Sequence, residues 1–158
     1  MSRRLYPAPM QRHARGISLI EVMVSVLVLA VGLLGIAAMQ SLALRGGQGS
    51  LESTQAIMAT NSILEAIRAN RTQADSYNMA KTCTTPSGGG SLVANDKADW
   101  IKSLKGTIGA GDATDTTVCG QISNCDDANA TTCTITVYWD DSRAGGGTSR
   151  SLSVESQI

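Results

Sequence analysis

The segment that decides the fold runs from residue 15 to residue 44 and reads RGISLIEVMVSVLVLAVGLLGIAAMQSLAL. From Val22 to Leu44 no residue carries a charge, and most are Val, Leu, Ile, Ala or Met. About 20 apolar residues are enough to cross the hydrocarbon core of a bilayer as a helix. We therefore predict that the segment 17–44 is a transmembrane helix.

A basic segment precedes this helix. Residues 1–16 contain four arginines and no acidic residue, whereas the whole chain has 13 basic and 13 acidic side chains. Removing this segment leaves nine basic and 13 acidic side chains, a net charge of −4. Arginine-rich flanks stay on the cytoplasmic side of a membrane, so we expect the remainder to be exported. Without a basic stripe and stacking aromatic residues, no nucleic-acid partner is expected.

Helical character continues beyond the apolar run. Each glycine of the stretch 46–49 costs a helix about 1 kcal/mol relative to alanine. Between residues 51 and 71 the small and apolar side chains recur on one helical face: Ala56, Ala59, Ile63, Leu64, Ala66 and Ile67. We predict one long helix over residues 17–70, either continuous or softened at 46–49. Its amphipathic half, residues 45–71, should pack on a sheet.

The remainder, residues 72–158, is predicted to be a periplasmic globular domain. Its clearest strand is 133–139, where every second side chain is apolar or cysteine. Residues 150–155 alternate as well and should pair with this strand across a long loop, and residues 118–122 are a candidate third strand. The fold class expected is α+β, with a long N-terminal helix packed on a small antiparallel sheet.

A short helix is also predicted over residues 95–105. Asn95 or Asp96 would cap its N-terminus. Trp100, Ile101 and Leu104 share its inward face.

All four cysteines lie in the region that would be exported: Cys83, Cys119, Cys125 and Cys133. An even count in such a region is typical of two disulfides in an oxidising compartment. Zinc sites usually need closer cysteine pairs than these, so no metal is expected. Four cysteines allow three pairings. Short loops close more readily, which favours Cys119–Cys125 together with Cys83–Cys133.

No catalytic set is visible in the chain. The single histidine, His13, lies in the basic leader, so the exported domain has no imidazole for acid–base or triad chemistry. Acidic pairs occur at 112 and 115, 126–127 and 140–141, and we interpret them as solvated loop carboxylates because none follows the EF-hand spacing. The expectation is a non-enzymatic protein that needs no cofactor.

Glu21 is the exception within the apolar segment. A carboxylate in a membrane segment costs a few kcal/mol and is by default a functional residue with a partner. Five positions before it stands Gly16, a small residue ahead of the apolar run, whereas an ordinary signal peptide has its small-residue cleavage site after a shorter apolar run. Gly16, Ile17 and Glu21 together resemble the processing motif of the type IV prepilin family.

The resemblance implies a specific chemistry for these residues. A prepilin peptidase would cut between Gly16 and Ile17, and Ile17 would then be methylated at its new amino group. The freed amine of one subunit would meet Glu21 of its neighbour in a filament, which sets the axial register. Ile17 stands where phenylalanine is commoner in the family.

Less sharply, segments 64–71, 99–100 and 137–141 look like the minor pilin class called PilV. That class implies an inner-membrane protein with its C-terminal domain in the periplasm and later a place in the extracellular pilus. The implied partners are other minor pilins, the major pilin, the prepilin peptidase, the inner-membrane assembly machinery and, before assembly, membrane lipid. Two alternatives share the N-terminal features: a minor pseudopilin of a type II secretion system, and a single-pass anchored periplasmic binding domain that never polymerises.

Leader cleavage separates the anchored domain from the filament subunit. We expect intact-mass analysis to show loss of residues 1–16 in cells that contain prepilin peptidase and retention of these residues in cells that lack it. A chain of the same mass in both strains would favour the anchor.

Overall fold

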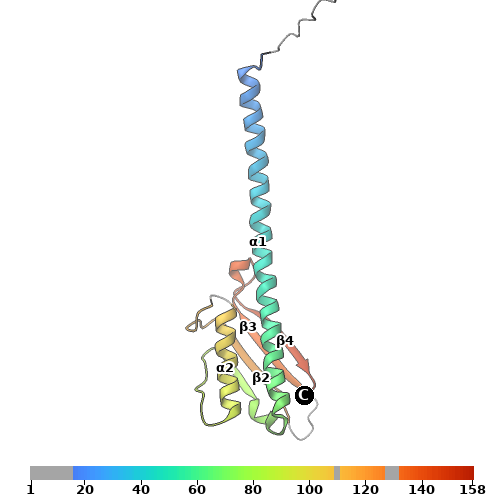
Figure 1. The fold of residues 1–158 in the computed structure, drawn as a ribbon, viewed down its shortest axis with the longest axis vertical. Helices are drawn as coiled ribbons and strands as arrows, with labels where there is room; N and C mark the ends of the chain where they lie inside the picture. Colours follow the sequence, from blue (N-terminus) through green and yellow to red (C-terminus); the bar gives the residue numbers. More distant parts are fainter. Residues whose placement is uncertain (1–15, 109–110, 127–131) are drawn as a thin grey trace, which may run out of the picture. The chain divides into compact units, whose positions relative to one another are not determined.

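The computed structural model describes residues 16–108, 111–126 and 132–158. Its elements follow the order α1 (Leu19–Ala69), η1 (Arg71–Tyr77), β1 (Met79–Thr82), α2 (Leu92–Thr107), β2 (Cys119–Ser123), β3 (Cys133–Trp139), η2 (Ser142–Ala144) and β4 (Arg150–Ser156). The predicted α+β class is confirmed: a long N-terminal helix accompanies a small antiparallel sheet and two disulfides (Figure 1). The described residues divide into two units, one that ends at Gln40 and one that runs from Ser41 to Ile158.

Helix α1 extends through the glycine-rich stretch without interruption. Positions 46–49 are helical, so the continuous version of the predicted helix is the observed one. Gly46 and Gly47 have open space around them, but Gly49 is buried. The glycine at 49 therefore serves a close contact rather than a break in the helix.

The four strands form an antiparallel meander in the order β1-β2-β3-β4. The predicted hairpin is confirmed, since β3 pairs with β4 and places Ile135 opposite Val154. The third strand, expected at 118–122, is β2 and lies one residue further along the chain. Strand β1 was not predicted; it has four residues and no alternation, and its pairing with β2 contains an irregularity between Met79 and Thr82.

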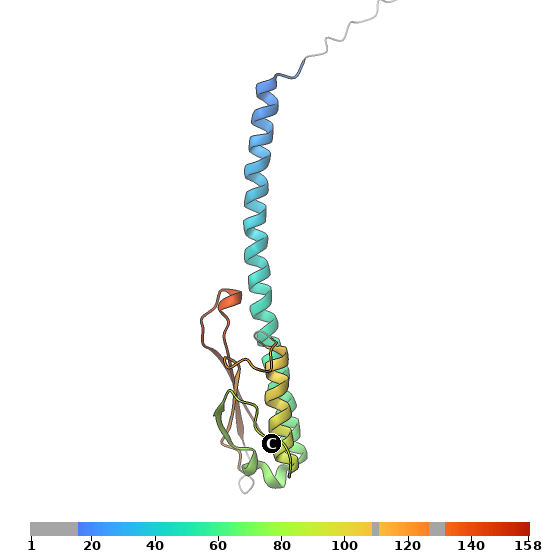
Figure 2. The same cartoon turned by 90° about the vertical axis from the view of Figure 1, so that its left-hand side faces the viewer.

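The core lies between the sheet and the helices of the second unit. Figure 2 shows α2 and the C-terminal part of α1 on the same face of the sheet. Strand β3 alternates between buried and half-buried positions, as its sequence predicts. The largest side chains of this core are fully buried or nearly so: Ile63, Leu64, Ile67, Tyr77, Trp100, Ile101, Leu104, Ile108, Ile122, Ile135 and Trp139.

Helix α2 begins earlier than predicted. Its cap is Ser91, whose hydroxyl oxygen accepts a hydrogen bond from the Ala94 N–H at 3.2 Å, rather than Asn95 or Asp96. The additional turn buries Val93 in the core. Asn95 has a different role, because its side-chain oxygen accepts the Gly89 N–H at 2.7 Å and holds the preceding glycine loop.

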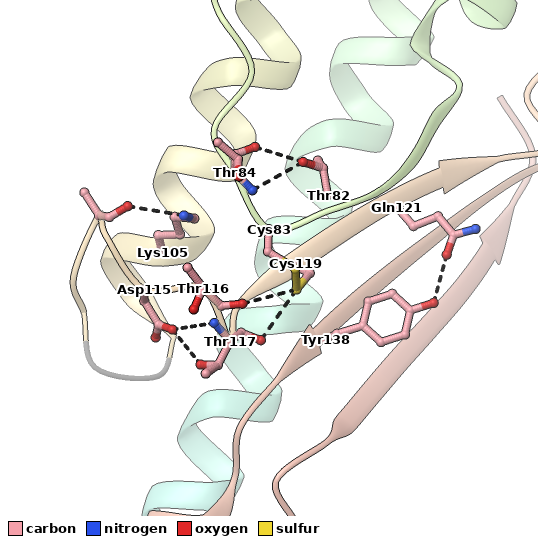
Figure 3. Close-up of a disulfide and its surroundings, with 11 residues drawn as sticks. Thr82, Cys83, Thr84, Lys105, Asp115, Thr116, Thr117, Cys119, Gln121 and Tyr138 are labelled. Carbon is pink, nitrogen blue, oxygen red and sulfur yellow. Dashed lines mark hydrogen bonds between the residues drawn. A yellow bond between two sulfur atoms is a disulfide. The ribbon is translucent and has the colours of Figure 1, made fainter.

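The predicted disulfide pairing is wrong. The structure joins Cys83 to Cys119, with Cα atoms 4.1 Å apart, and Cys125 to Cys133, with Cα atoms 4.4 Å apart. Cys83 directly follows β1 and Cys119 opens β2, so the antiparallel pairing of these strands places the two cysteines side by side (Figure 3).

Strand geometry explains the error. Cys119 is the first residue of β2 and Cys125 lies two residues after its last one, so the two cysteines are separated by this five-residue strand, about 13 Å long at ~3.3 Å per residue. A disulfide needs Cα atoms within about 7 Å of each other. Loop length alone favours pairing Cys119 with Cys125, but the extended strand between them keeps the two cysteines apart.

Gly120 in β2 lies where side chains of α2 pack directly on the sheet. A Cβ atom there would lie 2.6 Å from the Trp100 ring and 2.7 Å from the Ile101 side chain. Both of these side chains are buried and have no room to withdraw. Only glycine therefore fits between the sheet and α2 at this position.

We expect Gly120→Ala to destabilise the domain by about 1–3 kcal/mol, because it overpacks a filled core. The measurement is chemical denaturation of the disulfide-bonded protein in detergent, with unfolding detected by tryptophan fluorescence. Gly106→Ala is the matched control: Gly106 lies in α2 with nothing within 4 Å of a Cβ atom, so alanine should leave stability unchanged or raise it by up to about 1 kcal/mol. Equal denaturation midpoints for the two variants would contradict this packing.

Candidate functional site

The predicted processing residues lie at the start of α1. Residues 16–18 are outside the helix and exposed, and 77% of the Ile17 surface is accessible. A Cβ atom at Gly16 would meet nothing within 4 Å. The peptide bond between Gly16 and Ile17 therefore stands on accessible, non-helical chain, which is the form that a protease can bind.

Glu21 lies in the first turn of the helix. Its backbone N–H donates to the Ser18 carbonyl at 3.0 Å, and the Val22 N–H donates to the same oxygen at 3.3 Å. The carboxylate is exposed and close to the positive end of the helix dipole, where a negative charge is favourable. It stands four residues after Ile17, so one turn of chain separates it from the predicted new N-terminus.

The helix that follows exposes apolar side chains on all sides. It is long and apolar enough to cross a membrane, judged by length and composition, and its most apolar 18-residue window has no buried residue. Such a helix is stable only in lipid or against other apolar surfaces. Its exposed large side chains between residues 17 and 44 are Ile17, Leu19, Ile20, Val22, Met23, Val24, Val26, Leu27, Val28, Leu29, Val31, Leu33, Leu34, Ile36, Met39, Leu42 and Leu44.

The four cysteines lie in the other unit, where their role is structural. Each disulfide ties the end of one strand to the start of a neighbouring strand. Removing a native disulfide from a small domain typically costs about 2–5 kcal/mol. Among the described residues no group of three or more His, Cys, Asp or Glu side chains is arranged to hold a metal ion.

The acidic pairs do not all behave as solvated carboxylates. Asp112 is exposed and Asp140 is half-buried, and hydrogen bonds from Thr114 and Ser142, respectively, lower the pKa values of these two carboxyl groups. Asp141 is different, because it is 4% exposed and forms an ion pair with Arg150. Asp127 lies outside the described residues.

Sequence reasoning missed the cluster around Asp141, although two periodicities point to it. The inward positions of β3 recur every second residue, and the next position after Trp139 is Asp141. On α1, Gly49 and Glu52 precede Ala56 at the spacing of the buried helical face. The structure brings Glu52 and Asp141 together with Arg143 at this place.

Comparison with known proteins identifies one feature. The prokaryotic N-terminal methylation motif matches residues 11–37, which include Gly16, Ile17, Glu21 and more than half of the apolar run. No curated protein and no solved structure matches the chain. The motif, the accessible bond between Gly16 and Ile17 within it and the apolar helix that begins in it support a type IV prepilin-like protein.

Proposed function

We propose that this chain is a minor pilin of the type IV pilus, of the PilV class, that acts as a structural subunit rather than an enzyme. Before assembly, the segment 17–44 spans the inner membrane and the disulfide-bonded domain lies in the periplasm. Prepilin peptidase cuts between Gly16 and Ile17, and the processed subunit joins other minor pilins in the complex that starts the pilus. The observation that carries this proposal is the position of Glu21. It lies in the first turn of an apolar helix that follows the accessible peptide bond between Gly16 and Ile17.

The electrostatics of this helix require a partner. Glu21 is the only charged residue between Gly16 and Leu44, so the helix itself supplies no countercharge. An unpaired carboxylate in an apolar environment costs several kcal/mol, and a close cation offsets that cost. Cleavage creates such a cation at Ile17. In a bundle of staggered parallel helices, the Ile17 amine of one subunit reaches Glu21 of the next, and the pair fixes the axial position.

The exposed face of α1 favours assembly over a solitary anchor. From the last residue of the membrane-length segment onward, Leu44, Leu51 and Met58 recur every seven residues and are 72%, 57% and 65% exposed. The opposite face of the same helix, which includes Ile63 and Ile67, is buried in the domain. An apolar stripe at heptad spacing is suited to packing against another helix. A domain that only binds a soluble ligand does not need an exposed apolar stripe on this helix.

The Glu21→Ala variant tests the proposal. Cleavage should proceed, because the cut bond and its flanking residues are unchanged. Incorporation into filaments should fall roughly tenfold or more, since truncating one member of a buried charge pair costs about 2–5 kcal/mol. The readout is the ratio of this chain in sheared filaments to the chain in membranes, measured by quantitative mass spectrometry.

Two further variants make the result specific. Gly16→Val should block cleavage and thereby incorporation, while the folded domain keeps its stability because the site is open. Glu65→Ala removes a glutamate whose side chain is 70% exposed and pairs with Arg68, and it should change neither quantity. If Glu21→Ala is cleaved and incorporated as well as the Glu65→Ala control, the register role of Glu21 is wrong.

A further inference from the structure

The loop between β3 and β4 is seated on α1. Both views place the turn η2 beside the helix (Figures 1 and 2). The contact point is Gly49, where a Cβ atom would lie 3.3 Å from the Ala144 Cβ and 3.3 Å from Asp141 Oδ1. The absence of a side chain at Gly49 therefore lets the loop and the Asp141 carboxylate approach the helix backbone.

The Asp141 carboxylate is held in a fixed position by its own turn. The Asp141 carbonyl accepts hydrogen bonds from Ala144 N–H at 3.1 Å and Gly146 N–H at 2.9 Å, and its own N–H donates to the Gly147 carbonyl at 3.1 Å. A Cβ atom at Gly146 would overlap the carboxylate. The turn therefore fixes the backbone of Asp141 and packs Gly146 directly against its carboxylate.

Two carboxyl groups meet here, and each has one oxygen bound to an arginine. Arg150 Nη1 donates to Asp141 Oδ2 at 2.5 Å, and Arg143 Nη2 donates to Glu52 Oε1 at 3.3 Å. The arginine side chains are 44% and 54% exposed, whereas the Asp141 and Glu52 side chains are only 5% and 13% exposed. Water therefore screens the two cations more than it solvates the two carboxyl groups.

The remaining two oxygens have no donor among the described residues. Glu52 Oε2 and Asp141 Oδ1 are both buried and unpaired, and the two side chains are within hydrogen-bonding reach of each other. Two buried acceptors cannot satisfy one another without a hydrogen between them. Two ionised carboxylates this close to each other also repel, which favours the protonated form of Glu52. Burial is the largest cause of the raised pKa of Glu52; the charge of Arg143 lowers this pKa by less than burial raises it, and the repulsion from Asp141 adds to the rise.

We propose that a proton on Glu52 joins this side chain to the Asp141 carboxylate, and that this proton latches the β3–β4 loop onto α1. The Glu52 carboxyl O–H donates to the Asp141 carboxylate, which satisfies both inner oxygens at once. Loss of the proton leaves two buried negative charges face to face, and the loop is released. The charged groups nearest to the pair are Arg143 from the loop, Arg150 from β4, and Asp140, which precedes Asp141 and also interacts with Arg143. The residues Gln48, Leu51 and Gln55 of α1 and Thr107 at the end of α2 bring no charge.

The direction of the pH dependence follows from the raised pKa of Glu52. A group whose pKa is raised in the closed state contributes stability that is fully present below its ordinary value, about 4.3, and is lost as pH rises through the raised value. The closed loop is therefore an acid-stabilised state. One proton changes the equilibrium between closed and open loop by at most about tenfold per pH unit.

Hydrogen–deuterium exchange of the full chain in detergent micelles tests the latch. Protection of residues 142–149, corrected at each pH with the unfolded chain, should fall as the pH rises from 4 to 8, by up to about tenfold per unit. Glu52→Gln should remove this dependence and keep the acidic level of protection throughout, because its amide N–H donates to Asp141 without titrating. Glu65→Gln, an exposed glutamate on the same helix, should behave as the native chain.

Three results would overturn the proposal. The first is native protection that does not change with pH. The second is a Glu52→Gln variant that loses protection at acidic pH, which would show that both carboxylates act as ions toward the arginines. The third is a rise in protection on addition of Ca²⁺ at constant neutral pH, which would place a cation rather than a proton between the two oxygens.

Discussion

A carboxylate inside an otherwise apolar helix is the constraint on which the proposed assembly depends. Glu21 is followed by 23 uncharged residues, and no neighbour in that run can offset its charge. The proposed countercharge, the amine of Ile17, does not exist until the bond after Gly16 is cut. Processing and polymerisation are then linked by electrostatics: the uncut chain can enter the membrane, but it lacks the cation that makes packing of one helix on the next favourable.

The second half of α1 has two faces that pack differently. One face completes the core of the domain through Ile63 and Ile67, and the other leaves an apolar stripe exposed at Leu51 and Met58. A helix can serve both only if the domain holds it rigidly. Three devices provide this in the second unit: disulfides at both ends of β2, the close packing of α2 at Gly120, and the loop contact at Gly49.

The parts of the fold that repeat with a clear period were predictable from sequence. Alternation defined β3, and helical spacing defined the buried face of α1, because both patterns reflect which side chains leave water. Features that depend on tertiary pairing were not predictable in the same way. Strand β1 is recognisable only by its partner, and the disulfides follow from strand register rather than loop length. The burial of Asp141 was not predicted. Acidic residues in loops are usually solvated, whereas its position continues the inward alternation of β3. The N-terminal methylation motif could be recognised in the sequence, because its residues lie close together along the chain.

The most direct test is the identity of the first residue of this chain in filaments sheared from cells. Tandem mass spectrometry of the N-terminal peptide should find an N-methylated Ile17, at an abundance well below that of the major subunit. Recovery of a chain that still carries residues 1–16, or complete absence of the processed chain from filaments while it accumulates in the membrane, would contradict the proposed assembly.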